Sequence, residues 1–317
     1  MSVPVLALAG FLGAGKTTLL NHLLRNSRGV RIGALVNDFG AVNIDAMFVA
    51  GQVDAMASLS NGCICCAVDA SEAAEMLGRL AAVRPALDLI VVEASGIAEP
   101  PVLARTIATA GDDRFHYAGL VLVVDSAQPA ELGHGVRVAD LVVLNKATDG
   151  DADAVAAEVR AENPRVPLVY TDFARVDPAL LIDPPVRRRE RPAQLSLDEL
   201  LLEDNDHHHH EHPAYQSVEF SAEAPVNPRR FLAFLHDRPV GLYRAKGFVD
   251  FGAGGRYSVQ LVGSSLRFDK RGAAGRGTTL VLIGTGLDVE AVSSALQDCT
   301  REPADENAML GVHKYVV

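Results

Sequence analysis

The chain has 317 residues, of which 49% are hydrophobic, and it carries a formal net charge of -11 at pH 7. This acidic balance disfavours a general nucleic-acid-binding protein, because binding to phosphates needs a concentrated basic surface. No run of residues reaches the roughly 18 uninterrupted apolar positions of a membrane helix, so we expect neither nucleic acid nor a membrane as a partner.

Short apolar runs alternate with helical patterns over the first half of the chain. We predict strands at residues 5–9, 32–36, 89–92, 120–124, 141–144 and 168–170, and helices at 16–25, 71–83, 101–110 and 152–161. The predicted strands are continuously apolar, as is typical of strands that are covered on both faces. Strands that alternate with helices favour right-handed crossovers and a mostly parallel sheet. We therefore expect residues 1–175 to form a three-layer α/β domain.

The composition changes after this first domain. Residues 183–192 are rich in proline and arginine, and residues 202–212 are acidic and then rich in histidine, so we interpret residues 176–213 as a linker. Beyond it, strand patterns at 217–220, 242–248, 257–262 and 279–283 are interrupted by helical patterns at 228–235 and 289–296. This order predicts a smaller α+β domain over residues 214–317.

The first predicted strand leads into a glycine-rich turn and then a helix. Such a turn directs backbone N–H groups at an anion, and the helix adds its positive dipole end. Lys16 is expected to reach the β- and γ-phosphates of a nucleotide, and the hydroxyl of Thr17 to bind Mg²⁺. We interpret this motif as a P-loop, and the apolar run before it as a buried strand and not as a signal peptide. The candidate nucleotide-binding residues are Gly10, Gly13, Ala14, Gly15, Lys16, Thr17 and Thr18, of which Thr18 has a helical, structural character.

Two later strands end in acidic residues. Glu93 begins the sequence Glu93-Ala-Ser-Gly96, and Asp125 follows the strand predicted at 120–124. An acidic residue at a strand end can orient Mg²⁺ or its water, and the N–H of Gly96 can sense a γ-phosphate. We predict a catalytic role for Glu93 together with Lys16. Asp125 is explained equally well as a Mg²⁺ ligand or as a capping or surface residue.

The sequence Asn145-Lys146-Ala-Thr148 follows another apolar strand and is a candidate for recognition of the nucleotide base. A guanine-specific loop of this kind normally reads Asn-Lys-x-Asp, because a carboxylate accepts hydrogen bonds from both the ring N–H and the amine of guanine. Thr148 has no such fork, and Asp149 stands one position late. Charge-assisted hydrogen bonds contribute roughly 1.5–3 kcal/mol each. We therefore expect the protein to prefer GTP over ATP, but less strongly than a protein with the usual aspartate.

Three of the four cysteines stand together in Cys63-Ile-Cys65-Cys66. They are too close for long-range disulfide bonds, which predicts a reduced, cytoplasmic protein. Three thiolates suit Zn²⁺ or Co²⁺ and leave one tetrahedral position open, as suits an ion that is handed on. Asp38 is a candidate fourth ligand or a catalytic switch residue on the Mg²⁺ side. The alternatives for the cysteines are burial as small apolar side chains and redox chemistry.

A second group of metal-binding side chains lies in the linker, at His207, His208, His209, His210 and His212. Such a tract can collect Zn²⁺, Ni²⁺ or Co²⁺, but ordering it costs conformational entropy, so we expect a weak accessory site. A polar linker that binds metal only in vitro is the alternative. Cys299 and the scattered histidines are expected to have core or surface roles.

Taken together, these motifs resemble those of the CobW-type metallochaperone GTPases. The resemblance rests on the P-loop, Asn37-Asp-Phe-Gly40, the cysteine motif, Glu93-Ala-Ser-Gly96, Asn145-Lys-Ala-Thr148 and the histidine tract. The segment Arg244-Ala-Lys-Gly-Phe248 is similar to part of that family's second domain, so the resemblance covers nearly the whole chain. Asp38 stands where the family usually carries glutamate, and Thr148 replaces the usual aspartate.

The resemblance implies a slow GTP hydrolase that uses Mg²⁺, binds Zn²⁺ or Co²⁺ and delivers it to a client metalloprotein. A dimer that depends on nucleotide or metal is one further candidate arrangement. Because the cysteines lie between Asp38 and Glu93, we expect metal affinity to follow the state of the bound GTP or GDP. Two other functions fit the motifs: a P-loop small-molecule kinase that uses ATP, which Thr148 favours, and a non-catalytic zinc buffer.

Overall fold

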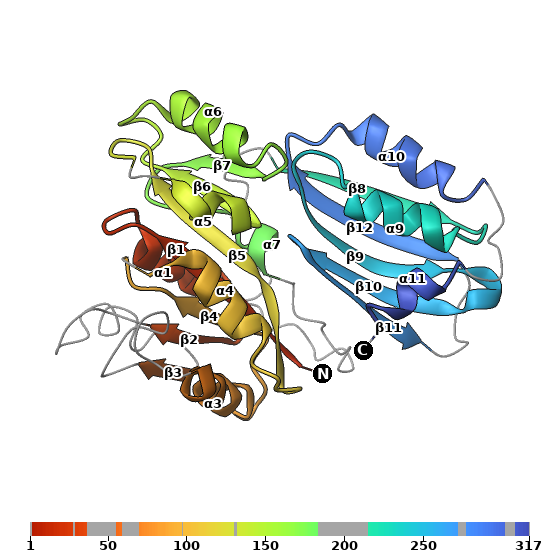
Figure 1. Ribbon diagram of the computed structural model, residues 1–317, viewed down its shortest axis with the longest axis horizontal. Coiled ribbons are helices and arrows are strands. Elements are labelled where there is room, and N and C mark those ends of the chain that lie inside the picture. Colours follow the sequence, from red (N-terminus) through yellow and green to blue (C-terminus); the bar gives the residue numbers. More distant parts are fainter. Residues whose placement is uncertain are drawn as a thin grey trace, which may run out of the picture.

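The structure is a computed structural model that describes residues 2–27, 29–36, 55–58, 70–96, 98–129, 132–182, 215–271, 277–301 and 308–316. Asp38, the three clustered cysteines and the histidine tract lie outside the described residues. The expected linker boundaries stay a prediction, because residues 183–214 also lie outside them. Two β-sheets lie side by side, each with helices packed on it (Figure 1).

In the part of the chain that the structure describes, the first sheet has seven strands in the order β3-β2-β4-β1-β5-β6-β7. Each pair of neighbours is parallel, which confirms the expected α/β class. Four of these strands, β1, β2, β4 and β6, are continuous apolar runs, as is typical of strands that helices cover on both faces. Their bounds are β1 (Val3–Gly10), β2 (Ile32–Val36), β3 (Ala55–Ser58), β4 (Leu89–Glu93), β5 (Phe115–Asp125), β6 (Leu141–Asn145) and β7 (Leu168–Thr171).

Helices pack on the two faces of this sheet through separate groups of buried apolar side chains. Among the described residues, one face contacts four helices through residues such as Leu77, Leu103 and Val155, and the other contacts two helices through residues such as Leu19 and Leu180. The first group is α3 (Ala70–Ala81), α4 (Pro100–Ala108), α5 (Gly133–Val138) and α6 (Ala152–Glu162); the second is α1 (Lys16–Asn26) and α7 (Pro178–Leu181). The expected three-layer arrangement is therefore confirmed.

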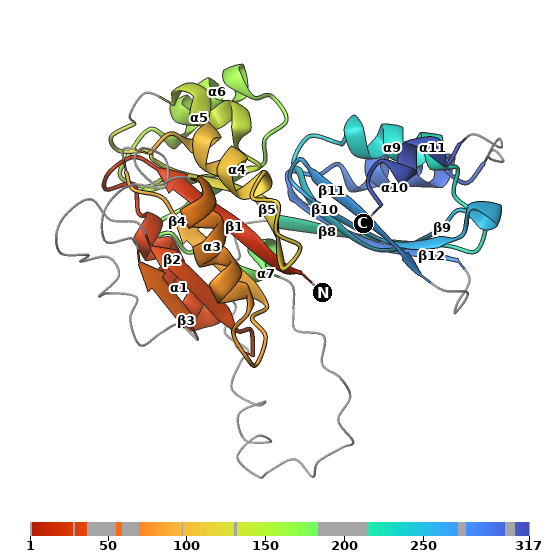
Figure 2. The same ribbon diagram turned by 60° about the horizontal axis from the view of Figure 1, so that its bottom comes forward.

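The second sheet is antiparallel, with the strand order β11-β10-β9-β12-β8. Its helices lie together on one face (Figure 2). Among the described residues, no helix has the length and apolar character needed to cross a membrane. The bounds are β8 (Tyr215–Ala222), α9 (Pro228–His236), β9 (Leu242–Asp250), η1 (Gly252–Gly254), β10 (Arg256–Val262), β11 (Ser265–Arg271), β12 (Thr278–Thr285), α10 (Val289–Asp298) and α11 (Leu310–His313).

The two sheet units share both apolar and polar contacts. Tyr243 of β9 is fully buried among the side chains that pack α1 and α7 onto the first sheet. Asp140, just before β6, is also buried. Its Oδ2 accepts hydrogen bonds within its own unit, from the N–H of Leu120 at 2.8 Å and the hydroxyl of Tyr117 at 3.1 Å. Its Oδ1 accepts from the N–H and Oγ of Ser264 in the other unit, at 2.7 and 2.9 Å.

Candidate nucleotide site

Glycines allow the loop between β1 and α1 to lie against neighbouring strands. Gly10, Gly13 and Gly15 have φ angles of 145°, 75° and 107°, a region that favours glycine. A Cβ atom on Gly10 would stand 2.2 Å from the carbonyl oxygen of Val123, and one on Gly15 would stand 2.4 Å from Nδ2 of Asn145. The loop is thus fitted closely to the ends of β5 and β6.

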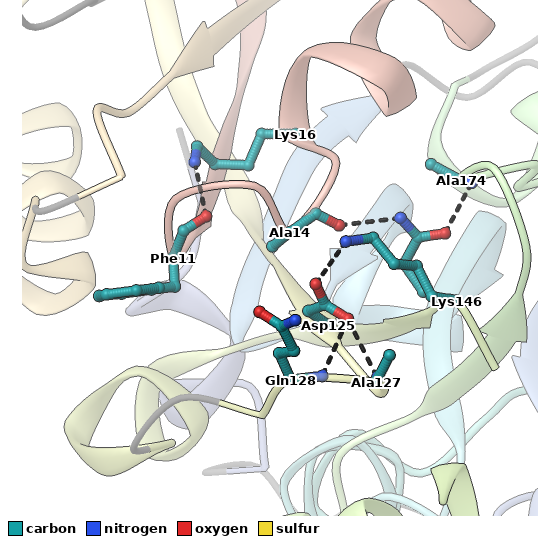
Figure 3. A network of polar contacts seen from close by, with 9 residues as sticks. Phe11, Ala14, Lys16, Asp125, Ala127, Gln128, Lys146 and Ala174 are labelled. Carbon is teal, nitrogen blue, oxygen red and sulfur yellow. Dashed lines mark hydrogen bonds and ion pairs between the residues drawn. The ribbon is translucent and has the colours of Figure 1, made fainter. Parts of the chain in front are cut away.

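Three of the predicted nucleotide-site residues meet at this loop. Lys16, the first residue of α1, is 8% exposed, and its Nζ donates a hydrogen bond to the carbonyl of Phe11 at 3.0 Å (Figure 3). The hydroxyl of Thr17 donates to Oε1 of Glu93 at 2.6 Å. Glu93 ends β4, which pairs with β1 in the register Leu8 to Glu93. The parallel pairing therefore brings this carboxylate to the start of α1.

The segment after Glu93 also packs against the loop. A Cβ atom on Gly96 would come within 2.8 Å of the Cα of Leu12, so a larger residue at position 96 would displace the loop backbone. Ala14 is buried, whereas Thr18 is exposed on α1, in agreement with its expected helical character. The sensing of a γ-phosphate by Gly96 stays a prediction, and the contact with Leu12 puts the glycine at the loop where that role requires it.

Asn145, at the end of β6, connects two loops at the same edge of the sheet. Its side chain is 2% exposed. Nδ2 donates to the carbonyl of Ala14 at 2.8 Å, and Oδ1 accepts from the N–H of Ala174 at 2.8 Å. These bonds connect the loop after β1, the end of β6 and the loop after β7. Both ends of the amide are therefore used to hold the backbone of the site.

Asp125 lies beside Lys146 at the end of β5. Its Oδ2 is 2.5 Å from Nζ of Lys146, and its Oδ1 accepts from the N–H groups of Ala127 and Gln128 at 3.0 and 3.2 Å (Figure 3). Partial burial raises the pKa of the Asp125 carboxyl, but the hydrogen bonds from Lys146 and the two amides outweigh it and lower the pKa below its usual range. Both oxygens of Asp125 thus have partners within the protein, and its role as a Mg²⁺ ligand stays a prediction.

Thr148 has an aspartate beside it that the sequence analysis did not single out. Its backbone N–H donates to Oδ1 of Asp172 at 3.2 Å. Asp172 directly follows β7, and the carboxyl ends of parallel strands lie at the same edge of a sheet. The end of the strand predicted at 168–170 was therefore the signal that could have pointed to it.

The predicted metal ligands stay predictions, because the clustered cysteines and the histidine tract are not described. Within the described ranges, no group of three histidine, cysteine or acidic side chains is placed to hold a metal ion. Cys299 is buried in the core of the second unit, and burial raises the pKa of its thiol to about 11. Of the two roles expected for Cys299, core or surface, the structure thus shows the core one.

Family comparisons agree with this architecture. A family model described as CobW/HypB/UreG, nucleotide-binding domain, matches residues 4–169, and the model of the cobalamin synthesis protein cobW C-terminal domain matches residues 215–300. The chain belongs to the CobW/HypB/UreG family. This membership confirms the predicted resemblance to CobW-type GTPases and the predicted nucleotide-binding domain.

Two zinc chaperones resemble the chain over most of its length. The zinc chaperone CobW of Sinorhizobium sp is 30% identical over 93% of this chain and 96% of its own. The zinc chaperone CobW of Pseudomonas aeruginosa is 31% identical over 93% of this chain and 91% of its own. The crystal structure of Zn(II)-bound YjiA GTPase from E. coli covers 94% of this chain and 99% of its own, with 23% identity and a TM-score of 0.43.

Proposed function

We propose that this chain hydrolyses GTP and couples the nucleotide state to the binding of Zn²⁺ or Co²⁺ for delivery to a client metalloprotein. The observation that carries the GTPase part is the hydrogen bond between Thr17 and Glu93 beside the buried Lys16. It joins the two elements that such an enzyme must connect, the phosphate-binding loop and a switch segment. The names of the CobW relatives support zinc as the cargo.

The donor set at the loop fits the Mg²⁺ ion that accompanies GTP. Mg²⁺ takes oxygen ligands, and the Thr17 hydroxyl and Glu93 carboxylate supply two oxygens 2.6 Å apart. When bound, the ion neutralises charge between the β- and γ-phosphates. Lys16 contributes a positive charge to the same phosphates, and the amides at the start of α1 donate to them. In this scheme Thr17 would hold the ion and Glu93 would orient it or its water.

Replacement of Lys16 tests the hydrolysis. Removing a donor that stabilises developing charge typically lowers turnover by about 100- to 1,000-fold, so Lys16→Ala should reduce phosphate release from GTP by at least about 100-fold. Lys314→Ala, at an exposed lysine in the second unit, is the matched control and should hydrolyse GTP like the wild type. Equal rates for wild type and Lys16→Ala would rule out the P-loop as the hydrolytic site.

The metal part of the proposal depends on coupling between the cysteines and the nucleotide. Cys63, Cys65 and Cys66 lie in sequence between Asp38 and Glu93, the two candidate switch residues. Moving a site from 99:1 to 1:99 occupancy needs a difference of about 5.5 kcal/mol between the two states. Structural zinc in small peptides contributes about 10–16 kcal/mol. Loss or distortion of a single ligand could therefore supply the required difference.

Metal titrations test this coupling. Zn²⁺ and Co²⁺ affinities should differ between the protein with GDP, with a non-hydrolysable GTP analogue and without nucleotide. The triple variant Cys63→Ser, Cys65→Ser, Cys66→Ser should lose the tight metal site and keep its nucleotide affinity. Cys299→Ala should keep the tight metal site, because this thiol is buried in the second unit. Equal metal affinities in all three nucleotide states would contradict the coupling and favour a passive zinc buffer.

A further inference from the structure

The loops that follow β6 and β7 are joined by hydrogen bonds directly beyond the strands. Asn145 and Thr171 are paired in the sheet. One step further, the N–H of Ala147 donates to the carbonyl of Thr171 at 3.2 Å. The N–H of Thr148 then donates to Oδ1 of Asp172 at 3.2 Å. The carboxylate of Asp172 therefore stands beside the position at which a guanine-specific loop carries its own carboxylate.

The backbone around Asp172 is held in an uncommon conformation. Phe173 and Ala174 have φ angles of 54° and 53°, a left-handed region in which residues other than glycine persist only where neighbouring contacts enforce it. Here the enforcing contacts are the bond from the Ala174 N–H to Asn145 and the bond from Oγ1 of Thr171 to the carbonyl of Asp172 at 3.2 Å. Since Asn145 also holds the P-loop, the carboxylate is fixed relative to the nucleotide site.

Guanine and adenine differ at the edge that a carboxylate recognises. Guanine presents a ring N–H and an amine, whereas adenine presents a ring nitrogen whose lone pair a carboxylate repels. Thr148 offers only a neutral hydroxyl. The carboxylate of Asp172 uses one of its roughly four acceptor positions on the N–H of Thr148. Asp149 lies in the turn after β6. Its side chain is exposed, and its N–H donates to the carbonyl of Lys146 at 3.2 Å.

We propose that Asp172 is the residue that recognises guanine in this chain, in place of a carboxylate at position 148. The inference rests on the proposed function as a GTP-binding protein and names the residue that sets its base preference. A hydrogen bond to a charged group contributes about 1.5–3 kcal/mol. Its loss in Asp172→Ala should weaken GDP binding by about 10- to 150-fold and leave ADP binding within about threefold of the wild type.

Asp172→Asn provides a gain of function that a purely structural role would not produce. An asparagine oxygen can accept from the ring N–H of xanthine while its amine donates to the xanthine C2 carbonyl, so this variant should bind XDP more tightly than GDP. Affinities of the full-length wild type, Asp172→Ala, Asp172→Asn and Asp149→Ala for GDP, XDP and ADP should be measured by calorimetry. Asp149→Ala is the matched control and should retain the preference for GDP.

The outcomes separate this inference from the proposed function. If the wild type prefers GDP and both Asp172 variants keep that preference, the inference is overturned while the proposed function stands. Loss of the preference in Asp149→Ala instead would assign recognition to Asp149 and likewise overturn it. If the wild type binds GDP no more tightly than ADP, the guanine part of the proposed function fails as well. Should Asp172→Ala fold poorly by circular dichroism, the near-isosteric Asp172→Asn carries the test.

Discussion

At the scale of single residues, the absence of a side chain shapes the phosphate loop more than the presence of one. Gly10 and Gly13 both have positive φ angles, but their surroundings differ. A Cβ atom at Gly10 would collide with the backbone oxygen of Val123 at 2.2 Å, whereas one at Gly13 would meet no atom within 4 Å. The sequence pattern marks both positions as glycine and does not reveal which of the two is sterically required.

Alanine substitution separates these two glycines. Gly10→Ala combines backbone strain with a contact that only movement of β5 can relieve, so it should lower the free energy of unfolding by at least about 3 kcal/mol. Gly13→Ala adds only the left-handed backbone strain and should cost about 1 kcal/mol. Urea unfolding at equilibrium measures both values. Equal losses would show that the approach of the loop to Val123 does not limit the choice of residue at position 10.

At the scale of elements, the sequence predicted the continuously apolar strands well and missed β3 and β11. The continuous apolar runs of β1, β2, β4 and β6 report coverage by helices on both faces, and this pattern is local in the chain. The strand β11, Ser-Leu-Arg-Phe-Asp-Lys-Arg, was not predicted: it lies at an edge of its sheet and carries charges in alternate positions. The short strand β3 was missed too, since Ala-Met-Ala-Ser is only four residues long and has none of the β-branched or aromatic residues that favour strands.

The candidate site was likewise predictable only in part. The P-loop and Glu93 were predictable because each follows a recognisable buried strand, and the parallel sheet brings such strand ends to one edge. The pairing of Thr17 with Glu93 depends on β4 lying next to β1, an order that the sequence pattern does not specify. Asp172 was missed for a related reason, because its relevance comes from a neighbour 24 residues away in the chain.

At the scale of the whole molecule, the contact between the two units includes a half-buried histidine, His116. Nδ1 of His116 at the start of β5 lies 2.9 Å from Oγ of Ser2, and the guanidinium of Arg267 on β11 donates to that same Oγ at 2.9 Å. Burial, and then the charge of Arg267, lower the pKa of His116 to about 4, partly offset by Asp269. The folded protein therefore keeps this imidazole neutral at pH values at which the unfolded chain protonates it.

The stability of the fold should accordingly depend on pH through His116. Between pH 6.5, the ordinary pKa of histidine, and about 4, the unfolded state binds a proton that the folded state does not. The contribution of the neutral histidine is complete above pH 6.5 and is lost as the pH falls, by about 3 kcal/mol in total. Denaturant unfolding from pH 7 to 4 should show this loss in the wild type relative to His116→Gln. The exposed His313→Gln should follow the wild type, and parallel curves for all three proteins would contradict the prediction.

Tyr243 bears on how the two units can be exchanged. By chain connectivity it belongs to the second sheet, and by packing it belongs to the interior of the first. A chimera that joined the first unit to an unrelated second domain would leave a tyrosine-sized void beneath α1 and α7, and a buried void of that size costs several kcal/mol. The second unit therefore cannot be replaced by an arbitrary domain, because any substitute must provide a side chain that fills this void.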